Sequence, residues 1–245
     1  MSAKSEQPSS PAPGSARDDL VLLGLLSVLA GLVDVIGFLR LGHVFTAHIT
    51  GNLVVMADEI ANGGPLHVAQ LLSIPVFVVA VAVAYAVVLQ ARTSRGRLPL
   101  LVGQALLLLL VLYFAVRANA VSTPTSSEQI LAAMLAVAAM AFQNAFIRLS
   151  LRESLTTSVM TGNVATSVIA FLALFWPGPW THEEAAGKLR RTVPLVLGFF
   201  AGCAFGAAAA TRLGPWSWSI PAVLSMAAIP LGVRLALPLA PVTGR

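Results

Sequence analysis

The chain has few charged residues and a single cysteine. Only 10% of its 245 residues are Asp, Glu, Lys or Arg, whereas ordinary soluble domains carry about 25%. Because 57% of the residues are hydrophobic, one water-soluble globule of this size could not bury them all, and lipid must cover the surplus. Cys203 is the one cysteine, which excludes an intrachain disulfide and any multi-cysteine metal site.

The sequence also lacks the short motifs that mark common catalytic sites. It contains no G-x-S-x-G and no P-loop. His182-Glu183-Glu184 resembles the start of an H-E-x-x-H zinc motif, but position 186 is alanine. His43 and His48 are five residues apart, a spacing that does not place both on one helical face. We therefore expect no enzyme activity, no metal site and no cofactor.

Eight apolar segments follow residue 17. A membrane helix needs about 20 apolar residues, and the length of the segments favours helices over barrel strands. We expect an all-α, polytopic membrane helical bundle over 18–245, a single membrane domain. Residues 1–17 are rich in Ser, Pro and Ala and are expected to form a disordered cytoplasmic tail. The segments run approximately over 20–41, 44–60, 67–91, 98–117, 128–149, 155–176, 192–211 and 216–237.

Two short motifs occur twice in the same order. Phe-x-Arg-Leu stands at 38–41 and again at 146–149, and T-x-x-x-T-G-N follows each copy, at 46–52 and at 157–163. Each pair falls at the same place in its half of the chain, which predicts a duplication. The two repeats run over about 20–117 and about 128–237.

The positions of the basic residues predict the topology. They lie between apolar segments, as orientation signals do, so the net charge of +5 does not indicate a nucleic-acid partner. If all eight segments spanned, the basic residues at 92–97 and 148–152 would lie outside the cell, against the positive-inside rule. If 44–60 and 155–176 instead re-enter or break, six spans remain and both termini are cytoplasmic. Three spans per repeat make the duplication inverted, as in many transporters, and we expect a place in the inner (plasma) membrane.

Asp34 is the most unusual residue of the apolar segments. An ionisable group inside a membrane helix costs at least about 2.5–3.5 kcal/mol on insertion scales, so Asp34 needs a partner or a path to water. The candidate partners are His48 and Asn52, with Gln143 and Asn144 near the equivalent place in the second half. Proton coupling through Asp34 and a purely structural role both remain open.

The paired T-G-N turns are the second feature that points to a site. Glycine permits backbone geometry closed to other residues, and asparagine is a good N-cap for the apolar stretch that follows each turn. A half-helix that starts inside the membrane would aim free N–H groups at a solute or ion; a pair of structural breaks is the alternative. The candidate substrate-binding residues are Asp34, His48, Thr50, Gly51, Asn52, Gln143, Asn144, Thr161, Gly162 and Asn163.

Small and aromatic residues predict contacts of the helices. Gly198, Gly202 and Gly206 repeat every four residues, a pattern that lets helices approach closely, either within the chain or in a homodimer. The four tryptophans stand at segment ends and are expected to anchor the bundle at the membrane interface. They are Trp176, Trp180, Trp216 and Trp218.

The runs GLVDVIGFLRLGHVFTAHITGN and AFQNAFIRLSLRESLTTSVMTGN resemble the YoaK-like family of small bacterial membrane proteins, a domain of unknown function. The resemblance covers most of the chain after residue 17 and implies an inner-membrane helical bundle, without a substrate. The polar residues favour a small secondary transporter or channel for a small polar or anionic solute, with its site at the paired T-G-N turns. A non-transporting scaffold or accessory subunit is the alternative, and a membrane-embedded enzyme is the third hypothesis.

Overall fold

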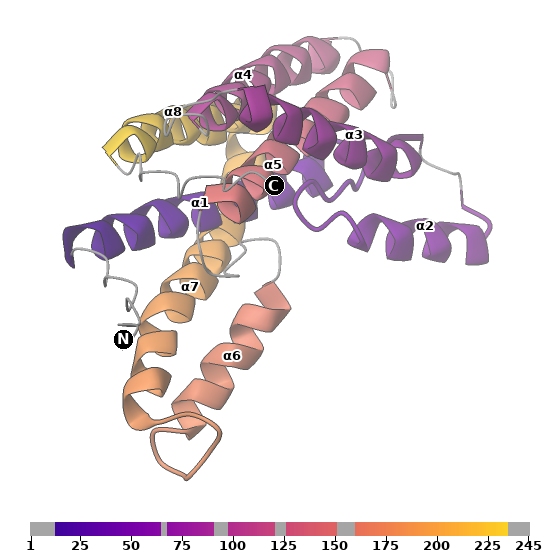
Figure 1. Ribbon diagram of the computed structural model, residues 1–245. Helices are drawn as coiled ribbons and strands as arrows, with labels where there is room; N and C mark the ends of the chain where they lie inside the picture. The colour runs from indigo at the N-terminus through magenta and orange to yellow at the C-terminus, as the bar shows by residue number, and fades with distance from the viewer. Residues whose placement is uncertain (1–12, 65–67, 91–97, 121–125, 151–159, 235–245) are drawn as a thin grey trace.

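The computed structural model describes residues 13–64, 68–90, 98–120, 126–150 and 160–234. Within these ranges every regular element is a helix (Figure 1). Five helical stretches are long and apolar enough to cross a membrane, with α7, η1 and α8 counted as one, so the predicted all-α membrane bundle is confirmed. The elements are α1 (Pro13–Arg40), α2 (Gly51–Ala61), α3 (Val68–Gln90), α4 (Leu98–Ala120), α5 (Ser127–Ser150), α6 (Met160–Leu172), α7 (His182–Leu213), the 3-10 helix η1 (Gly214–Trp218) and α8 (Ser219–Arg234).

Two helices begin earlier than the sequence predicts. Helix α1 starts at Pro13, so the last part of the predicted tail is helical, while residues 1–12 lie outside the described part of the chain. Helix α7 starts at His182 rather than at 192, because Thr181 and Glu184 form a capping box in which each side chain accepts a hydrogen bond from the backbone N–H of the other residue. The stretch 177–191, which lies between two of the expected apolar segments, is therefore mostly helix.

The two segments that were expected to re-enter or break contain short helices. Helix α2 has 11 residues and is about 17 Å long, much less than the hydrocarbon core of about 30 Å. The described part of α6 has 13 residues, and the predicted segment before Met160 lies outside the described residues. Helix α2 packs on α3 and extends away from the other helices, whereas α6 and α7 form a hairpin that projects from the bundle (Figure 1).

The contacts between helices follow one pattern in both halves of the chain. Helix α1 packs on α7 as α5 packs on α3, α2 packs on α3 as α6 packs on α7, and α4 packs on α5 as α8 packs on α1. With η1 counted as the start of α8, α3 packs on α4 as α7 packs on η1, and the two remaining pairings, α4 with α8 and α1 with α5, join corresponding helices of the two halves. If each helix of α1–α4 is exchanged with its counterpart in α5–α8, the same pairs of helices are in contact. A twofold axis between two four-helix units would give this pattern.

The corresponding helices α1 and α5 run in opposite directions. At one end of the pair Gln129 Nε2 donates to the carbonyl oxygen of Arg40 at 3.2 Å. Further along, Gln143 Nε2 donates to the carbonyl oxygen of Leu26 at 2.9 Å. Residue numbers thus rise along one helix as they fall along the other, and the two copies of Phe-x-Arg-Leu lie at opposite ends of the bundle.

Glycines let α1 and α7 approach very closely. A Cβ atom at Gly202 would lie 2.1 Å from the carbonyl oxygen of Val28, and one at Gly31 would lie 2.3 Å from that of Phe199. Gly198 and Gly206 also face backbone carbonyls of α1. The small-residue face of α7 is therefore covered by α1 of the same chain.

The tryptophans do not all lie at the surface. Trp216 and Trp176 are 60% and 64% exposed, as interfacial anchors would be. Trp218 is completely buried, because η1 contacts α1, α4 and α7. The prediction that Trp218 anchors the bundle at the interface is wrong.

Candidate functional site

The candidate site is built on the irregular segment between α1 and α2. After Arg40 the chain reverses at Gly42 and His43, whose φ angles are 76° and 59°. The following residues return along α1 toward Asp34, which lies about 9 Å before the end of that helix. Gly37 permits this return, since a Cβ atom there would be 3.0 Å from Thr46 Cγ2.

Asp34 supplies hydrogen-bond acceptors to the returning backbone. Its Oδ1 atom accepts from Thr46 N at 2.7 Å, from Ala47 N at 2.6 Å and from Thr46 Oγ1 at 3.0 Å. The side chain is almost fully buried, and water is scarce at such a place, so these amides need an acceptor from the protein. Asp34 therefore stabilises the break between the two helices.

His48 occupies the other oxygen of Asp34. Its Nδ1 atom lies 2.5 Å from Asp34 Oδ2, and its ring contacts the Phe199 ring of α7 with centroids 5.1 Å apart. An ionised Asp34 holds the proton of a neutral imidazole on Nδ1. The side chain of His48 is 31% exposed, and its Nε2 atom has no hydrogen-bond partner within the described part of the chain. The pair thus joins a buried carboxylate to a partly exposed imidazole.

Asn52 closes the irregular segment into a loop. Its Oδ1 atom accepts from Phe45 N at 2.7 Å, and its Nδ2 atom donates to Phe45 O at 2.8 Å and to Ser73 Oγ at 2.9 Å. The N-cap of α2 is Thr50, without a side-chain hydrogen bond, so the predicted capping by Asn52 is wrong. Gly51 is needed here for another reason: a Cβ atom would lie 2.9 Å from the Phe45 ring.

The backbone N–H groups at the start of α2 are already used. Gly51 N, Asn52 N and Leu53 N donate to the carbonyl oxygens three residues earlier, at 2.8, 3.1 and 3.2 Å. We expected these groups to point freely at a solute, and the structure contradicts this for the first turn of α2. The 3-10 bonds satisfy donors that a helix start otherwise leaves unpaired.

The structure does not bring the candidates of the second half to Asp34. Gln143 Oε1 accepts from Gln104 Nε2 at 2.8 Å, and Asn144 Oδ1 accepts from Arg148 Nε at 2.9 Å. The hydrogen bonds of Asp34 go to residues 46–48 instead.

The second T-G-N lies within the first described turn of α6. Asn163 is buried there, while Thr161 and Gly162 are exposed, as Thr50 is in the first half. Because Asn163 is inside the helix, it is not the predicted N-cap. Helices α2 and α6 make no direct contact in the described chain.

Sequence reasoning missed two buried hydroxyl groups that hold the short helices. Ser73 and Thr192 each stand two positions before a proline inside a long helix, Pro75 of α3 and Pro194 of α7. Ser73 Oγ accepts from Asn52 of α2 at 2.9 Å, and Thr192 Oγ1 accepts from Ser167 Oγ of α6 at 2.7 Å. The signal was present in the sequence as S-I-P-V at 73–76 and T-V-P-L at 192–195.

Comparison with known proteins identifies the family of the chain. Residues 22–231 match the family described as "Protein of unknown function (DUF1275)". The "UPF0700 transmembrane protein YoaK" of Bacillus subtilis (strain 168) is 58% identical over 41 residues, which are 17% of this chain and only 18% of that protein. No solved structure matches the chain. The resemblance to the YoaK-like family is confirmed, and the chain, a multi-pass membrane protein, belongs to the DUF1275 family.

Proposed function

We propose that the protein is a small secondary transporter or channel for a small polar or anionic solute, and that it is not an enzyme. The observation that carries the proposal is the His48–Asp34 pair at the break between α1 and α2. Ionisable residues within membrane segments commonly line a substrate or proton path. Irregular backbone at such depth is tolerated only beside protein or a water-filled cavity.

The geometry supports different roles for the two members of the pair. Both oxygens of Asp34 are occupied, so a solute would have to displace a hydrogen bond to reach them. His48 offers Nε2 and is partly exposed. We therefore assign the solute contact to His48 and a positioning role to Asp34.

One proton on His48 would change what the site attracts. With a neutral imidazole the pair carries a charge of −1 and repels an anion. With an imidazolium the pair is neutral and Nε2–H can donate to an acceptor on the solute. Binding of an acceptor-bearing solute and of a proton would then favour each other, which is the coupling that a secondary transporter needs.

The relation between the halves supports a transporter of the inverted-repeat type. Corresponding helices α1 and α5 run in opposite directions, and the contacts of one half recur in the other. In such proteins one repeat moves against the other around a fixed site, which opens it to each side in turn. We propose this arrangement in the inner (plasma) membrane, with both termini in the cytoplasm.

Flux measurements on matched histidine variants test the proposal. Proteoliposomes that enclose a pH dye would receive inward gradients of phosphate, glutamate or alanine, with protein-free liposomes as the blank. We expect proton movement that depends on one of these solutes and falls about tenfold in His48→Asn, as loss of about 1.4 kcal/mol of binding would produce.

His43→Asn is the control for this experiment. His43 packs against Phe38 and has a positive φ that asparagine tolerates, so this variant should retain the flux. A folded His48→Asn protein with unchanged flux, or the absence of solute-driven flux for all three probes, contradicts the proposal.

A further inference from the structure

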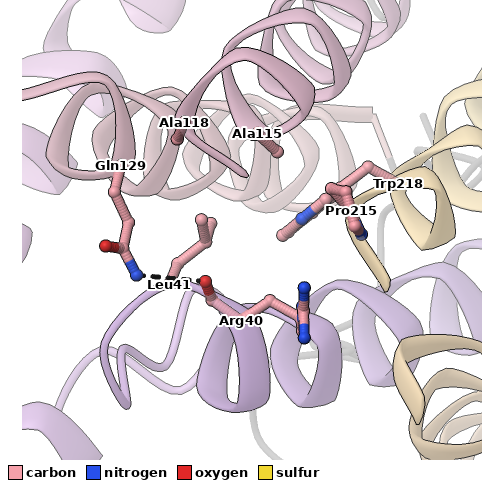
Figure 2. A pocket seen from close by; sticks show the side chains of 7 residues that line it. All are labelled: Arg40, Leu41, Ala115, Ala118, Gln129, Pro215 and Trp218. Atoms are coloured by element: carbon pink, nitrogen blue, oxygen red, sulfur yellow. Dashed lines mark hydrogen bonds between the residues drawn. The ribbon is translucent and has the colours of Figure 1, made fainter. Parts of the chain in front are cut away.

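A small cavity lies at the end of the bundle where α1 and α4 finish and α5 begins. Its volume is about 190 Å³, and it is lined by Arg40, Gln129 and Trp218 together with small and aliphatic residues (Figure 2). Gln129 Nε2 donates to the carbonyl oxygen of Arg40, which joins the start of α5 to the end of α1. The cavity is therefore framed by elements from both halves of the chain.

Trp218 brings an unsatisfied donor to this cavity. Its side chain is completely buried, yet its Nε1 atom has no hydrogen-bond partner in the described structure. Figure 2 shows the indole extending from η1 into the space between Arg40 and Ala115. A buried indole N–H ordinarily has an acceptor, because leaving it without one is costly. The site therefore calls for an acceptor that the described protein does not supply.

The charge of the lining indicates which acceptor fits. Arg40 contributes a guanidinium group to the cavity, and none of the described lining residues is acidic. Arginine binds carboxylate and phosphate through several N–H donors at once. With the indole N–H as a further donor, the cavity offers positive charge and hydrogen-bond donors to an anion.

We propose that this cavity binds a small anionic group between the guanidinium of Arg40 and the indole N–H of Trp218. At about 30 Å³ per water, about 190 Å³ corresponds to about six water molecules, which is enough for phosphate or a carboxylate of a few carbons. Drug-sized ligands need larger pockets, of about 300–1,000 Å³. The same chemistry describes a free anion and the phosphate of a lipid headgroup. The site does not depend on whether the protein transports a solute.

Quenching of Trp218 fluorescence tests the proposal. A variant that keeps Trp218 and carries phenylalanine at the other three tryptophans would be placed in phosphatidylcholine nanodiscs. Iodide, an anionic quencher, should quench Trp218 with a saturable dependence on concentration, while caesium at equal ionic strength should not. Arg40→Gln should weaken the apparent affinity for iodide about tenfold or more. Arg148→Gln, at the equivalent position of the second Phe-x-Arg-Leu motif, should leave it unchanged.

Competition distinguishes the two sources of the anion. Protection of Trp218 from iodide by added phosphate indicates a free anion, and protection only in phosphatidylglycerol nanodiscs indicates a lipid headgroup; both support the site. Equal quenching by iodide and caesium, no quenching by either, or unchanged affinity in Arg40→Gln overturns it. The comparison of iodide with caesium does not need the Arg40 variant, so it decides the question even if that variant does not fold.

Discussion

Asp34 and His48 act as a unit at the break between α1 and α2, but the two side chains satisfy different needs. Asp34 accepts hydrogen bonds from two consecutive backbone amides and a hydroxyl group, which gives it a structural role whatever the function of the protein. His48 uses Nδ1 for Asp34, and its side chain is partly exposed. The structural interpretation therefore applies to Asp34 and the functional one to His48, so the two interpretations do not exclude each other.

Asp34→Ala should lower the thermal stability of the purified protein much more than Asp34→Asn. Alanine removes every acceptor, and each buried amide left without one costs about 1–3 kcal/mol. Asparagine retains one oxygen that can still accept from Thr46 N and Ala47 N. The melting temperatures of the two variants can be compared by heating each protein and measuring, by size-exclusion chromatography, how much of it remains folded. Equal melting of Asp34→Ala and the wild type would show that these hydrogen bonds do not hold the break.

Gly202→Ala should destabilise the protein by about 1–3 kcal/mol, the usual effect of overpacking. The added Cβ atom would lie 2.1 Å from the carbonyl oxygen of Val28, so α1 and α7 would have to separate. Gly187→Ala is the matched control in the same helix, because no atom lies within 4 Å of a Cβ there and alanine favours the helix by about 1 kcal/mol. The prediction fails if both variants unfold at the same temperature.

At the scale of elements, each short helix donates a hydrogen bond to a buried hydroxyl group of a long helix. Helix α2 does so to Ser73 of α3, and α6 to Thr192 of α7. Ser167→Ala and Thr192→Val should each lower stability, and their effects should not add, because both remove the same 2.7 Å hydrogen bond. The expected coupling energy is about 0.6 kcal/mol, an average for side-chain hydrogen bonds between membrane helices. The wild type, the two single variants and the double variant form a double-mutant cycle, and equilibrium unfolding in mixed micelles measures the free energy of unfolding of each.

Thr211→Val is the control for this cycle. Thr211 Oγ1 donates to carbonyl oxygens of its own helix α7 and not to α6. Its effect should therefore add to that of Ser167→Ala. Additive effects of Ser167→Ala and Thr192→Val as well would contradict the role of this hydrogen bond in docking α6.

The starts of α3, α4 and α5 could be predicted closely from the sequence, whereas those of α1, α2 and α7 could not. Helices α3, α4 and α5 begin within one residue of the expected positions 67, 98 and 128, because long apolar runs follow polar stretches of sequence there. The start of α7 was missed since its first turns are polar, and a search for apolar runs does not detect the capping box of Thr181 and Glu184. The start of α2 was missed because the preceding apolar residues belong to the chain reversal.

The candidate site could be predicted only in part, for a similar physical reason. Asp34 and His48 were identified because an isolated polar group in an apolar segment needs a partner. The role of Asn52 was not predictable from its local preference for N-caps, since its partner Phe45 depends on the reversal at Gly42. Trp218 was misassigned because its burial depends on helices distant in sequence.

At the scale of the whole molecule, the directions of the helices test the topology. Spanning by all eight segments would place the end of α1 and the start of α5 on opposite sides of the membrane. In the structure these two ends meet, as Gln129 Nε2 donates to the carbonyl oxygen of Arg40. Six spans place both ends on the same side, in agreement with the positive-inside rule for the basic residues of α7.

Cysteine labelling from each side of the membrane is the corresponding prediction. Single cysteines would replace the exposed residues Asn62, Ser127 and Glu183 in a Cys203→Ala background. Asn62 follows helix α2, whose 11 residues are too few to cross a bilayer, and Ser127 begins α5 near the end of α1. We therefore expect a membrane-impermeant thiol reagent to label positions 62 and 127 from outside the cell.

Glu183 should be labelled only from the cytoplasmic side, because α7 runs parallel to α1. Gly198 faces Gly24, and Gly206 faces Leu32, so the start of α7 lies on the side where α1 begins. Eight spans would instead put positions 62, 127 and 183 on one side. Labelling of all three from the same side would therefore exclude the six-span arrangement and, with it, the inverted relation between the halves on which alternating access rests.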